Sequence, residues 1–381
     1  MSFHKQSVLI TTLFSLLLFL AQAHAAPVPA PPKIAATGHL LIDFDSGVVL
    51  SEENADEQLE PASLTKIMTA YVVLREIKAG SIHLEDQVLI SQKAWRTPGS
   101  RMFIEVNKQV SVEELLKGMI IQSGNDASVA LAEHVAGSEE TFAKLMNEHA
   151  QRLGMLNTHF VNSTGLPADT HFTTARDITR VAAATILEFP EYYQWYSEKE
   201  YTFNEITQQN RNKLLWRDDA VDGIKTGHTD AAGFCLVASA KKNNMRLISV
   251  VMGTSSENAR AKESQALLSY GFRFYETHRL YGALDPLAKV RVWKGDREQL
   301  RLGLAKDLYV TIPRGQYKNL TAGMNINPTI TAPVGLNQEM GTVKVSLGDE
   351  QVTEATLIAL DDIAEGGLWQ TLKDTALLWL E

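Results

Sequence analysis

Residues 61–77 read PASLTKIMTAYVVLREI, and this stretch decides the fold of the larger part of the chain. From Leu64 to Ile77 it is apolar on nearly every side, with few charged interruptions. A helix that is apolar all round is buried in the middle of a sizeable domain. Residues three apart share one helix face, so Ser63 and Lys66 come together at the start of this helix. We therefore expect a large domain with a hydroxyl and an amine paired near its centre.

Further helices are expected on the C-terminal side of this stretch. Ser111 with Glu114 fits a capping box before LLKGMIIQ, and Thr174 with Asp177 resembles one before ITRVAAATILEF. The chain from about 63 to 190 is therefore predicted to be mostly helical.

Strands are expected on both sides of the helical block. HLLIDF and VVLSE flank the turn residues 45–47, which predicts a hairpin at the start. After Asp222 come GIKTG, FCLVASA and RLISVVMG, three strand-length runs separated by turns. A helix from about 258 to 277 should cover one sheet face. The pattern favours an α/β (α+β) domain in which both ends share one antiparallel sheet, with the helices on one side.

Five segments are predicted along the chain. Residues 1–25 combine a charged start, an apolar run and Ala23-His24-Ala25, the parts of a secretory signal peptide. The other four are a stiff, unfolded Pro-rich lead-in (26–36), the large domain (37–283), a small β-rich domain of short alternating runs (284–363) and an amphipathic C-terminal helix (364–381). In that helix the apolar residues Leu368, Trp369, Leu372, Ala376, Trp379 and Leu380 lie on one side.

Composition excludes several classes of protein. The net charge of −9 has the wrong sign for a protein that binds mainly nucleic acid. The one cysteine, Cys235, cannot form an internal disulfide or build a thiolate metal site alone, and we expect it in the core. No spacing implies a metal or an organic cofactor. Export with one cysteine is typical of a bacterial periplasm or cell exterior.

The first candidate catalytic motif is Ser63-Leu64-Thr65-Lys66. A serine hydroxyl is a poor nucleophile until a base removes its proton, and a buried lysine with a lowered pKa can be that base. A helix N-terminus also presents backbone N–H groups where an oxyanion would form. Taken alone, the residues equally fit a helix cap and a surface cation.

Two further motifs follow in the chain. Ser123-Gly124-Asn125 ends a predicted helix, where a hydroxyl and a carboxamide can relay a proton and hold a substrate amide. Lys225-Thr226-Gly227 ends a predicted strand, where Gly lets a substrate backbone lie along the edge. A cation and a hydroxyl at that point suit a ligand that carries a carboxylate.

These three motifs, in this order, match a set found in class A β-lactamases and penicillin-binding proteins. The chain resembles the serine D-alanyl-D-alanine carboxypeptidases, the low-molecular-weight penicillin-binding proteins of the group that includes penicillin-binding proteins 5 and 6. RNKLLW (211–216), DGIKTGHTDAAGF (222–234), RLISVVMG (246–253) and IPRGQ (312–316) extend the resemblance over nearly the whole chain after residue 25. It implies a β-lactamase/transpeptidase-like domain, with its antiparallel sheet flanked by helices, and a small C-terminal all-β domain.

The resemblance implies roles for individual residues. Ser63 would attack the D-Ala-D-Ala peptide bond, Lys66 would take its proton and Ser123 would pass a proton to the leaving amine. The implied substrate-binding residues are Asn125, Lys225, Thr226, Gly227, His228 and Arg260, with the backbone N–H groups of Ser63 and His228 as oxyanion hole. Two interpretations of Arg260 stay open: it forms a second contact with the substrate carboxylate, or it is a solvated cation on a helix surface.

The implied partners are peptidoglycan stem peptides that end in D-Ala-D-Ala, and β-lactams as covalent inhibitors. The implied location is the periplasm, with weak contact of the C-terminal helix to the outer face of the inner membrane. A DD-endopeptidase, a weak β-lactamase and a non-catalytic peptidoglycan-binding module are the alternatives. From His149 to Leu187 the chain has no Glu to activate a deacylating water, and Asp169 is a weak substitute, so we expect a long-lived penicilloyl-enzyme.

Overall fold

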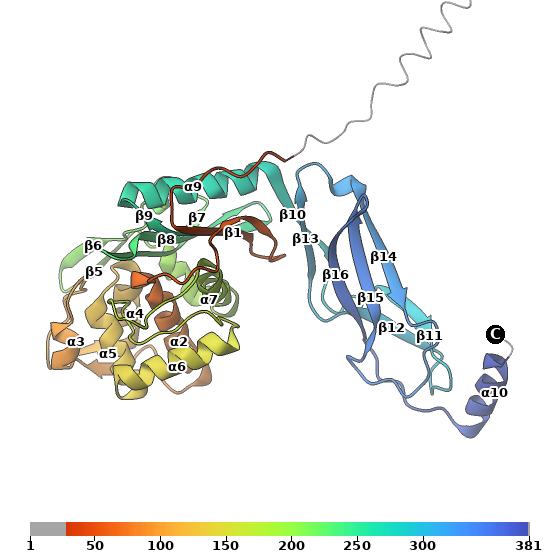
Figure 1. The fold of residues 1–381 in the computed structure, drawn as a ribbon. Helices are drawn as coiled ribbons and strands as arrows, with labels where there is room; N and C mark the ends of the chain where they lie inside the picture. Colours follow the sequence, from red (N-terminus) through yellow and green to blue (C-terminus); the bar gives the residue numbers. More distant parts are fainter. Residues whose placement is uncertain (1–27, 380–381) are drawn as a thin grey trace, which may run out of the picture.

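The computed structural model describes residues 28–379 (Figure 1). The predicted signal peptide lies outside the described residues, as does Leu380 of the C-terminal helix. Within the part that is described, no helix is long and apolar enough to cross a membrane.

One five-stranded antiparallel sheet organises the larger unit, in the order β2-β1-β9-β8-β7. Its strands are β1 (Gly38–Asp43), β2 (Val49–Glu53), β7 (Val221–Thr229), β8 (Gly233–Lys242) and β9 (Met245–Thr254). Because β1 pairs with β9, the start and the end of this unit share one sheet, as predicted. Strand β7 pairs only with β8 in this sheet, so its other edge is available to the site described below.

The helical block packs on one face of the sheet (Figure 1). It contains α2 (Thr65–Ala79), α3 (Gln92–Arg96), α4 (Val112–Ile121), α5 (Asn125–Ala136), α6 (Glu139–Arg152), α7 (Ala175–Glu188) and α8 (Pro190–Tyr193), with short 3-10 turns η2 (Ala62–Leu64), η3 (Gln194–Ser197) and η4 (Lys213–Trp216). Two small hairpins, β3–β4 (Gln87–Leu89, Gln109–Ser111) and β5–β6 (Glu200–Phe203, Ile206–Gln209), border the block. The first ten residues of α2 are all buried, which confirms the all-round apolar reading.

The two predicted helix caps differ in detail. Ser111 and Glu114 form the complete capping box at α4. Thr174 caps α7 by accepting from the Asp177 backbone N–H, but the Asp177 carboxylate accepts from Asn157 and Arg180 instead of reaching back.

Helix α9 (Glu257–Phe274) covers the opposite face of the sheet. The expectation that the helices lie on one side is therefore wrong. Strands β1, β8 and β9 place apolar side chains on both faces of the sheet, so each face must be covered by helices.

The lead-in also differs from the prediction. Residues 28–36 form no helix or strand, yet Ile34 is buried against α9 and Tyr270 donates to the Pro29 carbonyl (3.0 Å), so this part is packed and not unfolded.

The smaller unit is built from β strands, as the resemblance implies. A five-stranded antiparallel sheet in the order β11-β12-β16-β15-β14 contains β11 (Ala288–Arg291), β12 (Gln299–Leu304), β14 (Leu320–Ile326), β15 (Glu339–Leu347) and β16 (Glu350–Ala359). Strand β10 (Tyr275–Tyr281) follows α9 directly and pairs with β13 (Leu308–Pro313), and a turn, η5 (Tyr317–Asn319), precedes β14. Helix α10 (Leu368–Leu378) lies at the far end of this unit (Figure 1).

Candidate active site

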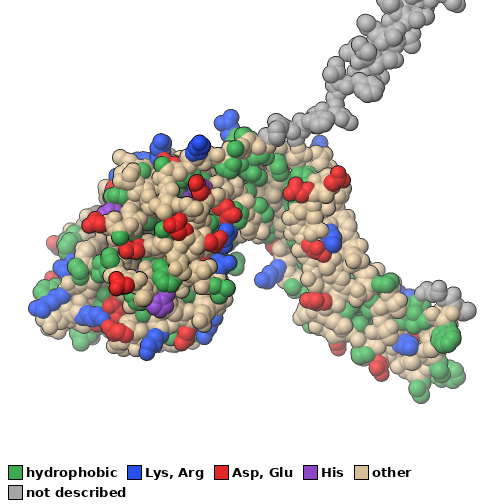
Figure 2. Space-filling model, in the orientation of Figure 1, with side chains coloured by type: hydrophobic (Ala, Val, Ile, Leu, Met, Phe, Trp, Pro, Cys, Tyr) green, Lys and Arg blue, Asp and Glu red, His purple; other side chains and the backbone are tan. Residues whose placement is uncertain are grey.

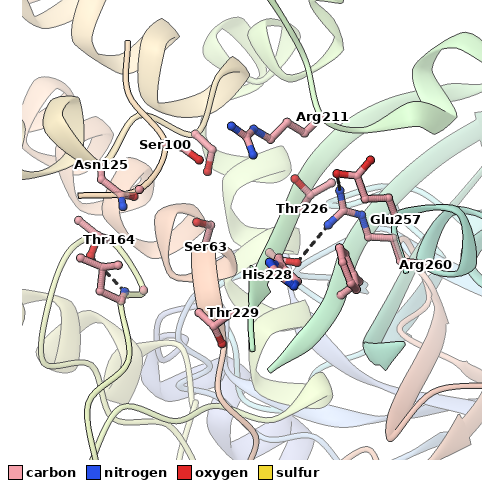
Figure 3. Close-up of a pocket in the computed structure, with 16 residues that line it drawn as sticks. Ser63, Ser100, Asn125, Thr164, Arg211, Thr226, His228, Thr229, Glu257 and Arg260 are labelled. Atoms are coloured by element: carbon pink, nitrogen blue, oxygen red, sulfur yellow. Dashed lines mark hydrogen bonds and ion pairs between the residues drawn. The ribbon is translucent and has the colours of Figure 1, made fainter. Parts of the chain in front are cut away.

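The three sequence motifs meet at one cavity of about 390 Å³ (Figure 3). Its walls come from η2, the turn between α4 and α5, the 164–166 loop, the free edge of β7 and the start of α9. Figure 3 shows Asn125 and Thr164 on one side of Ser63, and Thr226, Glu257 and Arg260 on the other.

Ser63 lies in η2, two residues before the start of α2. Lys66 lies in the first turn of α2 and is 1% exposed. The helical spacing brings Lys66 Nζ within 3.1 Å of Ser63 Oγ, as the sequence predicted. Ala62, directly before Ser63, has a φ of +46°, a left-handed conformation that is strained for a residue with a Cβ.

Lys66 has three oxygen neighbours. Besides Ser63 Oγ, its Nζ contacts Asn125 Oδ1 (2.6 Å) and the Thr164 carbonyl (2.5 Å). Burial, and secondly the nearby Arg211 guanidinium, lower the pKa of Lys66 from 10.5 to about 7. A neutral amine has two N–H groups for the two carbonyl oxygens and one lone pair for the Ser63 hydroxyl. The geometry therefore suits a base that takes a proton from Ser63.

Ser123 and Lys225 form a second buried pair. Lys225 Nζ donates to Ser123 Oγ (2.9 Å) and to the Thr226 carbonyl (3.0 Å). Burial, then the charges of Lys66 and Arg211, hold the pKa of Lys225 well below its ordinary value. Ser123 has a φ of +65°, so the turn between α4 and α5 holds its hydroxyl in an uncommon backbone conformation at the cavity wall.

Asn125 begins α5 and ties two walls of the cavity together. Its Oδ1 accepts from Lys66, and its Nδ2 donates to the Pro98 carbonyl (2.6 Å). The next residue, Asp126, is buried and accepts from the backbone N–H groups of Met102 (3.0 Å) and Phe103 (3.0 Å). This holds the 98–103 loop beside the cavity.

Thr226, Gly227 and His228 line the cavity from the edge of β7. The sequence reading assigned Gly227 to substrate approach, and the structure adds a second reason for it. A Cβ there would lie 3.0 Å from the Pro61 carbonyl oxygen and 3.2 Å from Ala62 Cβ, so Gly227 lets β7 approach the turn that carries Ser63. The His228 ring stacks on Phe234 with centroids 4.0 Å apart.

Arg260 is 4% exposed, so the solvated-cation reading is wrong. Its Nη1 donates to the Gly227 carbonyl (3.1 Å), and its guanidinium lies over the Phe234 ring at 5.6 Å. Arg260 therefore supports the edge of β7 and adds positive charge to the cavity.

Sequence reasoning missed other lining residues, among them Ser100, Arg211 and Glu257. Arg211 begins the RNKLLW stretch noted above, but nothing in its spacing to the three motifs marks it. The Glu257 carboxylate is paired with Lys213 (2.8 Å), which holds its pKa below the ordinary value. Ser100 lies in the 98–103 loop, Arg211 lies just before η4 and Glu257 begins α9, so tertiary packing alone brings them to the cavity.

Two family models match the chain. The model for D-alanyl-D-alanine carboxypeptidases matches residues 24–256, and the model for the C-terminal domain of penicillin-binding protein 5 matches residues 275–365. The chain belongs to the D-alanyl-D-alanine carboxypeptidase family. The second match begins at β10, the strand that pairs with β13 of the smaller unit.

Individual family members resemble the chain over nearly its full length. The D-alanyl-D-alanine carboxypeptidase DacC of Escherichia coli is 46% identical over 95% of this chain and 93% of that protein. The crystal structure of penicillin-binding protein 5 from Haemophilus influenzae matches with a TM-score of 0.86 at 42% identity, covering 88% of this chain and 100% of the other. A structure of penicillin-binding protein D2 from Listeria monocytogenes in a cefotaxime-bound form matches with a TM-score of 0.59 at 29% identity, over 64% of this chain and all of the other. The predicted family and fold class are thus confirmed.

Proposed function

We propose that this protein is a serine-type D-Ala-D-Ala carboxypeptidase that removes the terminal D-Ala from peptidoglycan stem pentapeptides through an acyl-enzyme on Ser63. The observation that carries the proposal is the contact of Ser63 Oγ with the buried Lys66 amine at the wall of the cavity. The activity named for the relatives above supports it.

Acylation follows from the two serine–lysine pairs. Neutral Lys66 accepts the Ser63 proton as Oγ attacks the penultimate D-Ala carbonyl, and the backbone N–H groups of Ser63 and His228 stabilise the oxyanion. Ser123, held by Lys225, passes a proton to the nitrogen of the departing D-Ala. Thr226 and Arg260 hold the terminal carboxylate, and Asn125 binds the backbone of the acyl part. Water then hydrolyses the Ser63 ester and restores the hydroxyl.

We propose that β-lactams acylate Ser63 and leave it slowly. A member of this fold has been solved with cefotaxime bound, which supports recognition of this class of inhibitor.

The slow release follows from the carboxylates near the acyl group. The loop residues Thr164, Gly165 and Leu166 at the cavity carry no carboxylate. Asp169 is exposed and lines a neighbouring cavity with Pro167 and Phe172. Glu139, behind the loop, accepts from Ser163 (2.9 Å) and pairs with Lys93 (3.1 Å). Neither carboxylate is placed to activate a deacylating water.

We propose a periplasmic location with weak contact to the outer face of the inner membrane. The apolar run in residues 1–25 supports export. Several apolar side chains of α10 face outward, including Trp369 (87% exposed) and Leu372 (63%), and Figure 2 shows hydrophobic side chains gathered at that end. Asp374 instead points inward and accepts from the Lys294 backbone N–H (2.6 Å), so α10 is held with its apolar side outward.

The test is release of free D-Ala from diacetyl-L-Lys-D-Ala-D-Ala by the purified protein. Ser63→Ala should abolish both release and labelling by a fluorescent penicillin, because Ser63 has the one hydroxyl paired with Lys66 among residues 28–379. Ser81→Ala, an exposed serine after α2, is the matched control and should retain both. Release of D-Ala by Ser63→Ala would contradict the proposal. A folded protein that releases no D-Ala would instead favour a binding module.

A further inference from the structure

The loop of residues 161–168 forms one wall of the active-site cavity through Thr164, Gly165 and Leu166. Residues 161–168 form no helix or strand, yet Ser163, Thr164 and Gly165 are buried. Buried backbone outside regular structure must find its hydrogen-bond partners in side chains or in other segments. In this loop the side chain of Asn162 supplies several of these partners.

Asn162 folds the next four residues around its own carboxamide. Its Oδ1 accepts from the backbone N–H groups of Thr164 (3.1 Å) and Gly165 (2.7 Å), and from Thr164 Oγ1 (3.0 Å). Its Nδ2 donates to the Leu166 carbonyl (2.9 Å). Thr164 Oγ1 in turn accepts from the Leu166 N–H (3.2 Å), drawn as the dashed line beside Thr164 in Figure 3. One side chain therefore sets the shape of the loop.

This shape aims the Thr164 carbonyl at Lys66. The carbonyl lies 2.5 Å from Lys66 Nζ, and Asn125 Oδ1 lies 2.6 Å from the same atom. A lysine amine rotates freely on its flexible stem, so the acceptors around Nζ decide where its lone pair points. With both N–H groups paired to these two oxygens, the lone pair is directed at Ser63 Oγ (3.1 Å). If the Thr164 carbonyl moves away, an N–H group can face Ser63 in place of the lone pair.

A further contact fixes the loop against α2. His171 is 3% exposed and its Nε2 contacts Thr65 Oγ1 (2.8 Å), beside Lys66 in the first turn of α2. Because His171 Nδ1 accepts from the Val161 N–H (3.3 Å), Nε2 carries the ring proton. Burial lowers the pKa of His171 to about 4, so this contact does not change around neutral pH. His171 thus holds the loop in place, and Asn162 determines which carbonyl faces the amine.

We propose that Asn162 is a positioning residue of the reaction, which holds the Thr164 carbonyl on the Lys66 amine by folding residues 163–166 around its carboxamide. The lone pair of the amine is then kept toward the hydroxyl of Ser63. This inference rests on the proposed function, in which Lys66 is the base. Asn162 is half-buried and is not among the residues that line the cavity, so its effect on the reaction passes through the loop.

Acylation by a fluorescent penicillin at saturating concentration tests the proposal. Asn162→Ala removes all four hydrogen bonds and should slow acylation by about 10²-fold, the cost of a misplacement near 1 Å. Asn162→Asp keeps an oxygen acceptor that forms the same kind of turn, and should recover about tenfold of that loss. The rates are compared on the high-pH plateau, where the added carboxylate of Asn162→Asp does not change the fraction of neutral Lys66.

The pH profile of acylation separates positioning from a general loss of stability. Burial is the main cause of the lowered pKa of Lys66, and the charges of Arg211, Asp126 and Glu139 also act on it. Asn162→Ala changes none of these charges, but a displaced loop lets water reach the amine. The rising limb of the profile should therefore move to higher pH than in the wild type.

Asn147→Ala is the matched control. Asn147 of α6 holds the chain just before the loop through the same kind of bonds: its Oδ1 accepts from the Phe160 N–H (2.9 Å) and its Nδ2 donates to the Phe160 carbonyl (2.7 Å). Neither bond involves residues 163–166. Asn147→Ala should lower the melting temperature, yet keep the wild-type acylation rate and the wild-type pH limb.

A folded Asn162→Ala with wild-type acylation and an unmoved limb would overturn the proposal, as would equal losses of rate in Asn162→Ala and Asn147→Ala. Where Asn162→Ala does not fold, Asn162→Gln displaces the amide by one methylene and takes its place, with the same expected result. Ser63→Ala and Lys66→Arg separate the two proposals. If either keeps wild-type labelling, both proposals fail; if both lose it while Asn162→Ala labels normally, only the positioning role fails.

Discussion

Lys66 shows how burial changes the chemistry of one residue. A surface lysine is protonated at neutral pH and cannot accept a proton. Here the helix core around Lys66 disfavours the charged form, while Asn125 Oδ1 and the Thr164 carbonyl keep its N–H groups paired. The same residue in the same motif would be inert on an exposed helix.

The pH dependence of D-Ala release tests this directly. The pKa of Lys66 is lowered to about 7, so the neutral form accumulates above that value and not above 10.5. The kcat/KM should rise with pH and level off above about 7, because only the neutral amine can accept the Ser63 proton. Lys66→Arg, which cannot lose its proton, should cost about 10²- to 10⁴-fold in kcat. A rising limb centred near pH 10 would show that Lys66 is not the base.

At the scale of elements, the turn that carries Ser63 is clamped between two segments. Strand β7 approaches it at Gly227, and the 164–166 loop approaches it from the other side at Gly165. A Cβ on Gly165 would lie 1.7 Å from the Ala62 carbonyl oxygen, which is backbone and cannot rotate away. The position of the nucleophile therefore depends on two glycines far from it in sequence.

Gly165→Ala should displace the turn and slow acylation by fluorescent penicillin by about 10²-fold, the cost of a misplacement near 1 Å. Gly154→Ala is the matched control. Gly154 also has a positive φ (+73°), but nothing lies within 4 Å of its added Cβ. The Gly154→Ala variant should lose roughly 1–2 kcal/mol in free energy of unfolding from backbone strain alone and should keep the wild-type acylation rate. Equal acylation rates in the two variants would refute the clamp.

At the scale of the whole molecule, a buried polar cluster joins the two units. Asp43, at the end of β1, is 0% exposed and accepts from Thr277 Oγ1 of β10 (2.7 Å) and from the Ser46 backbone N–H (2.8 Å). Thr311 of β13 contacts both Thr277 (2.9 Å) and Ser46 (2.6 Å). The cluster thus ties the first hairpin of the large unit to the first strand pair of the smaller one.

Thr277→Val should lower the free energy of unfolding by about 1.5–3 kcal/mol, because it removes a hydrogen bond to a buried carboxylate. The kcat of D-Ala release at 25 °C should stay at the wild-type value, since the cluster is remote from the cavity. Thermal melting and a kinetic assay measure the two effects. Thr356→Val, an exposed threonine on β16, is the control and should melt like wild type. An unchanged melting temperature in Thr277→Val would contradict the role of the cluster.

The outward face of α10 is also a property of the whole molecule. Residues 367–381 carry one lysine against Asp374 and Glu381, so we expect the proposed membrane contact to gain little from anionic lipid and to depend on apolar side chains. Trp369→Ser/Trp379→Ser should reduce binding to lipid vesicles, whereas Trp95→Ser, an exposed tryptophan of α3, should not. Membranes from cells should release the protein to mild detergent more readily than to salt. A protein found wholly in the soluble periplasmic fraction would rule out the anchor.

The sequence by itself determined the family, the fold class and the Ser63–Lys66 pair. Helix geometry places residues three apart on one face, so a local pattern was enough for that pair. The meander of β7, β8 and β9 was also predictable, because alternating apolar runs and turn residues act over short distances.

The resemblance already implied the other motif residues of the site, but only the tertiary structure showed how they meet and which further residues join them. The contact between Ser123 and Lys225 spans 102 residues, and Arg211 and Glu257 reach the cavity through packing that no spacing encodes. The burial of Arg260, which the sequence left open, and the placement of α9 on the face opposite the helical block were likewise decided by packing. Burial, and with it the lowered pKa of Lys66, is a sum over neighbours from many parts of the chain, and these neighbours are assembled only when the chain folds.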